Sequence, residues 1–189
     1  MTDPAPPNSD AELFTRSASR LATLFFSDLE ELGRFEPSAV DNLPPDYRTL
    51  LAHTDHMTVA LESFHRTPVS VRVLAEWRDE ASYARCSLLS RQTDRAIVQF
   101  GIMRIWLADL PAAAQAEITT KLAPLGRVLI EHNVLREVEL IALWRIDPGP
   151  VLRQHLQVSG KTPLYGRTAQ ILVEERPTVQ LLEIVKVAD

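Results

Sequence analysis

Three strand-like segments that follow one another near the middle of the chain constrain the fold most. They cover residues 68–76, 83–90 and 95–107, and in the first of them Val69, Val71 and Val73 alternate with polar residues. Because they are consecutive, we expect them to pair as antiparallel neighbours. A parallel α/β fold would instead alternate strands with helices along the chain.

Helices and further strands surround this block. We expect helices over residues 11–32 and 46–64, a loop over 33–45, and a helix with a further short helical turn between 110 and 131. After these come a long strand over residues 133–146, a short helix over 149–157, and a closing hairpin of 164–175 and 178–187, which turns across Glu175, Arg176 and Pro177. This order predicts an α+β fold with an antiparallel sheet of about six strands and helices on one face.

The composition fits a globular protein of one domain. The chain has 189 residues, 46% of them hydrophobic, and a net charge of −5. This charge argues against non-specific nucleic-acid binding, which needs a basic face, but it allows a small anionic ligand bound by locally placed arginines. Residues 1–10 are polar and proline-rich, so we expect a disordered tail there, followed by a helix and linker over 11–45 and the main domain over 46–189.

The single cysteine and the hydropathy pattern indicate the compartment. Cys86 cannot form an intrachain disulfide, which favours a reducing environment and a buried structural thiol. No apolar run reaches the roughly 20 residues that a membrane-spanning helix needs, and the N-terminus does not resemble a signal peptide. We therefore expect a cytoplasmic protein without a membrane span.

Recognised cofactor and metal motifs are missing from the sequence. His53 and His56 lie three residues apart with Asp55 between them, but no third ligand follows at a recognised spacing. There is also no phosphate-binding glycine loop, no G-x-S-x-G and no C-x-x-C. We expect neither a metal nor a cofactor.

An acidic residue interrupts the apolar side of the last predicted strand. Val179, Leu181, Glu183 and Val185 share one side, which is the more apolar of the two and is expected to face the interior. An unpaired buried carboxylate is costly, so Glu183 needs a partner, a proton or a cavity. Two interpretations stay open: a structural position, in an ion pair or on a solvent-facing strand, and an acid that lines a cavity.

Arginines occupy similar positions in other predicted strands. Arg167 shares a side with Ala169 and Ile171, and Arg136 shares one with Val138, Leu140, Ala142 and Trp144. Arg85 lies in a strand whose two sides are both mixed. On the inner face of a sheet, a guanidinium can bind a planar carboxylate through two parallel hydrogen bonds. Surface or structural ion pairs remain the alternative for each arginine taken alone.

Five short motifs, in order, resemble the chorismate pyruvate-lyase (4-hydroxybenzoate synthase) family. They are LLAHTDHMTVALESFHRTPVSVRVL, YARCSLL, APLGRVL, LYGR and TVQLLEIV, and together they extend from about Leu50 to Val185. The resemblance implies an antiparallel sheet with helices on one face and helical flaps over a closed cavity. The activity that it implies is the elimination of pyruvate from chorismate without a cofactor, which leaves 4-hydroxybenzoate.

The same resemblance suggests roles for individual residues. It gives Arg85 the ring carboxylate, and it gives Glu183 a contact with the 4-oxygen, where the enolpyruvyl ether breaks and where the carboxyl group could act as an acid. Met57 and Leu125 would line the pocket through their backbones. Arg136 and Arg167 are candidates for the enolpyruvyl carboxylate.

Departures from the family pattern leave other functions open. The helix over residues 11–32 has no counterpart in the family core, His65 and Arg66 replace a usual glycine and lysine, and the spacing from Pro177 to Glu183 is one residue longer than expected. One alternative is a non-catalytic sensor of aromatic carboxylates, because the effector domains of some bacterial regulators resemble this fold. A basic winged helix, which would precede such a domain in a regulator, is not expected in the acidic residues 1–48. A structural protein with a filled pocket is the third alternative.

Overall fold

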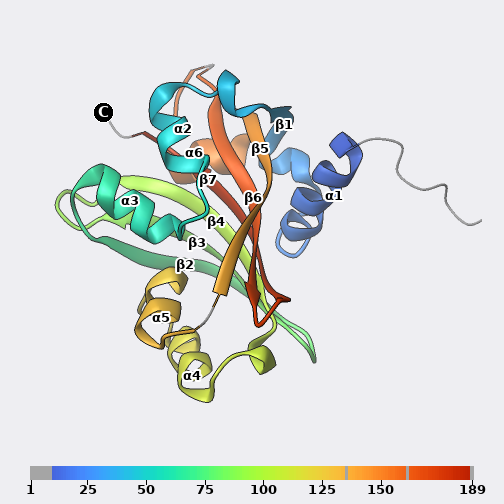
Figure 1. The fold of residues 1–189 in the computed structure, drawn as a ribbon. Helices are drawn as coiled ribbons and strands as arrows, with labels where there is room; N and C mark the ends of the chain where they lie inside the picture. The colour runs from blue at the N-terminus through green and yellow to red at the C-terminus, as the bar shows by residue number, and fades with distance from the viewer. Residues whose placement is uncertain (1–9, 135, 161, 188–189) are drawn as a thin grey trace, which may run out of the picture.

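Seven strands form one antiparallel sheet in the described residues, 10–134, 136–160 and 162–187, of the computed structural model (Figure 1). The strands are β1 (Gly33–Ser38), β2 (Val69–Arg78), β3 (Tyr83–Arg91), β4 (Ile97–Ile105), β5 (Arg136–Pro148), β6 (Leu164–Val173) and β7 (Arg176–Val185). Their order across the sheet is β1-β5-β6-β7-β4-β3-β2. The predicted α+β class with an antiparallel sheet is confirmed, including the consecutive pairing of β2, β3 and β4.

Six α-helices cover both faces of this sheet within the described ranges. They are α1 (Asp10–Ala22), α2 (Pro45–Leu51), α3 (Met57–His65), α4 (Ala112–Thr120), α5 (Leu125–Glu131) and α6 (Pro150–Leu156). Helices α1 and α6 pack on one face, and α2 to α5 pack on the other. Both faces carry helices because both sides of β7 are apolar and each side needs a cover.

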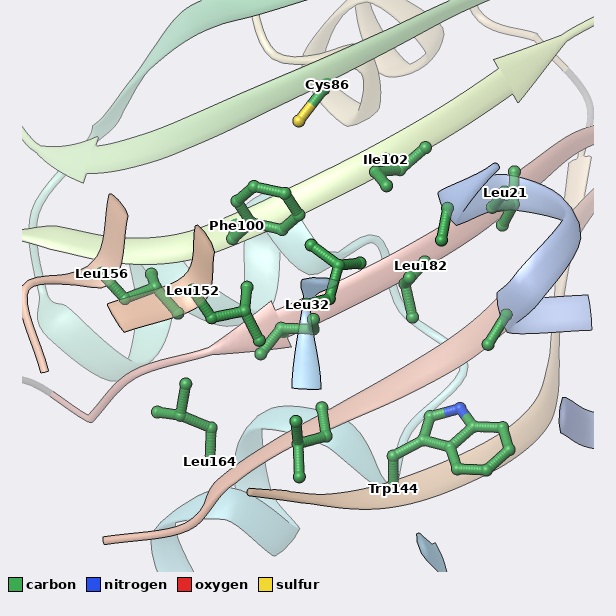
Figure 2. Packing of buried hydrophobic residues seen from close by; sticks show 14 of the residues in the cluster. Leu21, Leu32, Cys86, Phe100, Ile102, Trp144, Leu152, Leu156, Leu164 and Leu182 are labelled. Carbon is green, nitrogen blue, oxygen red and sulfur yellow. The ribbon is translucent and has the colours of Figure 1, made fainter. Parts of the chain in front are cut away.

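The core under α1 and α6 is a continuous apolar layer (Figure 2). Leu21 of α1 and Leu152 of α6 lie over Phe100 and Leu182 of the central strands. Cys86 belongs to this layer, where burial raises the pKa of its thiol to about 12. This face of the sheet is therefore filled with side chains, and the room for a ligand lies on the opposite face.

Two of the predicted helices are shorter than expected. The first ends at Ala22 instead of residue 32, and the second is divided into α2 and α3 by residues 52–56. In that break the carbonyl oxygens of His53 and Asp55 accept hydrogen bonds from Arg167 of β6. Tertiary hydrogen bonds therefore take the place of helical ones at this point.

The predicted loop over residues 33–45 contains a seventh strand. Residues 33–38 form β1, which pairs with β5 at the edge of the sheet. Proline is tolerated on an edge strand because no further strand needs its missing N–H group, and Pro37 occupies such a position. The proline-rich composition therefore hid a strand at the sheet edge.

A β-bulge in β5 changes which of its side chains share a face. In β5 the register shifts between Leu140 and Ala142, so Val138 and Leu140 face the helices α2 to α5, whereas Ala142 and Trp144 face α1 and α6. The expectation that Arg136 shares one side with all four residues was wrong, because one extra residue inverts the alternation.

The hairpin of β6 and β7 is present, with a turn one residue earlier than expected. Glu174 and Glu175 form the turn, both with positive φ (50° and 66°), as two-residue hairpin loops require. A second bulge follows, because Ile171 pairs with Val179 while Leu172 pairs with Pro177. The extra residue of β7 lies between Pro177 and Glu183, the interval whose spacing is one residue longer than expected. The predicted tail falls outside the described residues, apart from residue 10, with which α1 begins.

Candidate functional site

A cavity lies between the sheet and the N-terminal ends of α3 and α5. Strands β3, β4, β6 and β7 form its floor, and residues 56–58 and 124–126 form its roof. The cavity has a volume of about 600 Å³ up to and including its open mouth. These dimensions suit a small compound rather than a nucleotide or a lipid chain.

The floor is built around a row of paired residues across four strands. Ser87 of β3 pairs with Gly101 of β4, Gly101 pairs with Glu183 of β7, and Glu183 pairs with Arg167 of β6. Gly101 has no side chain, so the backbone between Ser87 and Glu183 is not covered by a side chain of this row. We call this position the shallow point. This point lies inside the cavity, which all four residues line.

Arg85 faces the same cavity from the neighbouring row, where it pairs with Met103. Arg85 and Glu183 are separated by two strands across the sheet and by two residues along it. Strand geometry therefore places their Cα atoms roughly 12 Å apart. The two charged side chains therefore face one hollow from separate strands, with the shallow point at Gly101 between them.

In the described part of the chain the buried Arg85 guanidinium forms no ion pair with a carboxylate, although the Tyr83 hydroxyl and the charge of Glu76 favour its charged form. The residue is 2% exposed, and its Nη1 atom has no hydrogen-bond partner there. Its Nη2–H donates to the carbonyl oxygen of Ala123, 3.4 Å away. Burial lowers the pKa of Arg85 from its usual value, yet a guanidinium stays charged in proteins. A buried cation of this kind is complementary to an anion in the cavity.

Arg167, in contrast, is fully engaged by the protein. It is 0% exposed, and its Nε–H donates to Oε2 of Glu183 at 2.7 Å. Its Nη1–H donates to the carbonyl oxygen of His53 at 2.9 Å, and its Nη2–H donates to that of Asp55 at 3.3 Å. The pair of Arg167 and Glu183 therefore ties β6 and β7 to the segment between α2 and α3.

This ion pair defines what Glu183 can do. Glu183 is 6% exposed and lines the cavity, so it is accessible to a ligand there. Its Oε2 atom accepts a hydrogen bond from Nε–H of Arg167 at 2.7 Å, so this side of the carboxyl group is committed to the protein. Glu183 is thus in a buried ion pair and also lines the cavity, and its role as an acid toward a ligand stays a prediction.

Gly166 makes the close pairing of these strands feasible. A Cβ atom at this position would lie 2.6 Å from the carbonyl oxygen of Glu183, closer than side chains are found. Close packing of β6 against β7 therefore requires the glycine of the LYGR motif. This glycine precedes Arg167 and pairs with the residue that follows Glu183.

Met57 and Leu125 lie in the roof, and both are buried. They are the first residues of α3 and α5, where the first amide N–H groups of a helix have no partner within the helix. His56, which precedes α3, provides no side-chain cap. Gly126 lets the two helix ends approach, because a Cβ atom there would lie 3.0 Å from Oγ1 of Thr58.

Arg136 is not brought into the cavity with Arg85. It lies at a separate surface pocket, where its Nε–H donates to Nε2 of His56 and its Nη1–H donates to the carbonyl oxygen of Val134 at 2.5 Å. His56 and Val138 line both pockets. Arg136 thus contacts the cavity lining through its hydrogen bond to His56.

His56 and Gln99 line the cavity and were not identified as site residues from the sequence. Burial lowers the pKa of His56 to about 4, and the charges of Arg136 and Arg167 act in the same direction, so the imidazole is neutral at pH 7. Gln99 is 6% exposed. The sequence could have indicated Gln99, because it is a polar residue on the same side of its strand as Gly101 and Met103.

No group of three or more His, Cys, Asp or Glu residues that could hold a metal ion occurs in the ranges that the structure describes. Nor does any helix there have the length and apolar character needed to cross a membrane.

Comparison with known proteins yields structural neighbours only. No family model matches the chain, and no curated protein matches it. The structure is similar to that of PhnF from Mycobacterium smegmatis, with 12% identity, a TM-score of 0.49, and coverage of 68% of this chain and 62% of that one. It is also similar to the ligand-binding domain of a transcriptional regulator assigned to the GntR family from Bordetella bronchiseptica (15% identity, TM-score 0.46, 63% and 85% coverage).

A further neighbour is the C-terminal domain of the histidine utilization repressor from Pseudomonas syringae pv. tomato, with 11% identity, a TM-score of 0.44, and 64% and 96% coverage. Likeness at this level does not assign a function, so function has to be argued from the site itself.

Proposed function

We propose that this protein binds a small aromatic carboxylate in the cavity, with the carboxylate group against Arg85, and releases it unchanged. The buried guanidinium with an unpartnered Nη1 carries this proposal. A charged group removed from water needs compensation, and the planar fork of arginine fits a carboxylate through two hydrogen bonds.

The rest of the cavity supports a flat, mostly apolar ligand. Met103, Leu181 and Ile171 supply apolar walls. The N-terminal end of α3 adds amide dipoles that favour negative charge in the same space. An aromatic ring with one carboxylate combines these features.

The distribution of cations favours binding over the lyase reaction. Chorismate carries two carboxylates, and two buried arginines line the cavity, Arg85 and Arg167. Arg167 already donates to Glu183, His53 and Asp55. Only Arg85 of this pair has an unpartnered nitrogen, which suits a monocarboxylate better than a dianion.

The chorismate lyase reaction is the second candidate, and one observation favours it. Arg85 and Glu183 line the same cavity on either side of Gly101, the arrangement that a carboxylate anchor and a group at the 4-oxygen would need. Loss of pyruvate aromatises the ring, so orientation of the substrate and movement of one proton would suffice.

Calorimetric titration with benzoate and 4-hydroxybenzoate tests the binding proposal. We expect the protein to bind at least one of them, and Arg85→Met to weaken that binding by at least about thirtyfold, because a desolvated charge-assisted pair is lost. Arg91 is the matched control: it lies on the same strand but pairs with Asp94. Arg91→Met should bind like the parent protein.

Three results would overturn the proposal. If neither compound binds, or if Arg85→Met binds its ligand as tightly as the parent protein does, Arg85 is not the anchor. Pyruvate release from chorismate above the spontaneous rate, abolished in Glu183→Gln, would replace the binding function with the lyase.

A further inference from the structure

Gln99 of β4 has a buried side-chain amide that the protein leaves unsatisfied. The residue is 6% exposed, and its Oε1 atom has no hydrogen-bond partner in the described ranges. A buried amide without partners is destabilising, and an apolar residue of the same size would avoid that cost. Because Gln99 lines the cavity, a bound ligand can supply the missing partner.

The amide lies over the shallow point of the cavity floor. A Cβ atom built on Gly101 would be 3.1 Å from Nε2 of Gln99 and 4.0 Å from its Cδ atom. The side chain therefore folds back toward Gly101 from its own position two residues earlier on β4. It lies near the row that contains Ser87 and Glu183.

Gln99 and Arg85 contact opposite ends of the same space. Along β4, Gln99 precedes Gly101, whereas Met103, the pairing partner of Arg85, follows it. A ligand with its carboxylate at Arg85 therefore directs its far end toward the Gln99 amide, which lies over Gly101. That end meets an amide oxygen, which accepts hydrogen bonds, and an amide nitrogen, which donates them.

We infer that Gln99 determines specificity by binding a hydroxyl group at the end of the ligand opposite to its carboxylate. This inference rests on the proposed binding function and narrows its ligand to hydroxylated monocarboxylates. A hydroxyl both donates and accepts, so it satisfies the amide in either orientation of its terminal atoms. A second carboxylate has no proton to donate and would lie beside the carboxylate of Glu183, which disfavours it.

Three benzoates of equal ring size test this inference: benzoate, 2-hydroxybenzoate and 4-hydroxybenzoate. We expect the parent protein to bind 4-hydroxybenzoate at least about tenfold more tightly than benzoate, and to gain nothing from the 2-hydroxyl. In Gln99→Met the advantage of 4-hydroxybenzoate should fall below about threefold, with benzoate binding unchanged. The melting temperature of ligand-free Gln99→Met should equal or exceed that of the parent.

Gln170→Met is the matched control, because Gln170 donates to Glu139 on the other face of the sheet. This variant should keep the preference for the 4-hydroxyl. If Gln99→Met keeps the full preference while Arg85→Met abolishes benzoate binding, the inference is wrong and the proposed function stands. If Gln99→Met lowers the melting temperature and weakens all three benzoates alike, Gln99 is structural. If the parent binds none of the three, both the inference and the proposed function are wrong.

Discussion

Replacement of Arg167 by methionine should destabilise the protein more than any other single change in the cavity. Its side chain and that of Glu183 are 0% and 8% exposed, so solvent screens their interaction little. The change leaves Glu183 as a buried charge without its partner and removes the hydrogen bonds to His53 and Asp55. Breaking a buried pair of this kind costs roughly 3–5 kcal/mol, and we expect about 4 kcal/mol here.

A double-mutant cycle separates the ion pair from its surroundings. Glu183→Met should cost about 2 kcal/mol, because Arg167 keeps its two carbonyl partners. The double variant should cost about 3 kcal/mol rather than the sum of about 6, because it leaves neither charge uncompensated. The expected coupling is therefore about 3 kcal/mol.

Urea denaturation followed by circular dichroism measures each free energy of unfolding. A double variant whose loss equals the sum of the single losses within about 0.5 kcal/mol would refute the reasoning, because additivity means that the two groups do not interact. A loss below about 1 kcal/mol for Arg167→Met would refute it as well.

Three further predictions concern stability around the cavity. Arg85→Met should raise the free energy of unfolding of the ligand-free protein by about 1 kcal/mol in urea denaturation, because it removes a buried charge that has no acidic partner; a loss of more than about 1 kcal/mol would contradict this. Gly126→Ala should destabilise by about 1–3 kcal/mol and weaken benzoate binding, because its Cβ atom would lie 3.0 Å from Oγ1 of Thr58; an unchanged melting temperature would count against the close approach of α3 and α5. The pKa of His56 is lowered to about 4, below its unfolded value, so the unfolded state binds more protons at mildly acid pH and stability should fall as the pH drops from about 6.5 toward 4. The difference between the parent and His56→Gln should shrink by about 1–2 kcal/mol between pH 7 and pH 4.5, and a difference that does not vary with pH would contradict the depressed pKa.

The side-chain alternation of individual strands made part of this arrangement visible in the sequence. Glu183 stands among apolar residues on one side of its strand, and the structure buries that side. Arg167 follows the same pattern and is fully buried. Such signals are local, because each needs only the residues of one strand.

The partners of these residues could not be predicted in the same way. That Arg167 pairs with Glu183 depends on the hairpin register, which the bulge between Ile171 and Leu172 shifts by one residue. Its bonds to His53 and Asp55 depend on the break between α2 and α3, which helix periodicity did not indicate. Long-range hydrogen bonds decide both features, and no local pattern encodes them.

The predictions of individual strands were wrong where a single residue changes the strand geometry. The bulge in β5 moves Trp144 to the opposite face from Val138, although simple alternation puts them together. Strand β1 was hidden because Pro37 suggests a loop unless the strand lies at a sheet edge. Edge positions and bulges follow from the assembled sheet rather than from the segment alone.

A crystal structure of the protein with bound 4-hydroxybenzoate tests the central claim most directly. We predict the ligand carboxylate within hydrogen-bond distance of Nη1 of Arg85, the ring inside the cavity, and the ion pair of Arg167 and Glu183 intact. A ligand bound outside this cavity, or a carboxylate that displaces Glu183 from Arg167 and leaves Arg85 without a partner, would contradict it.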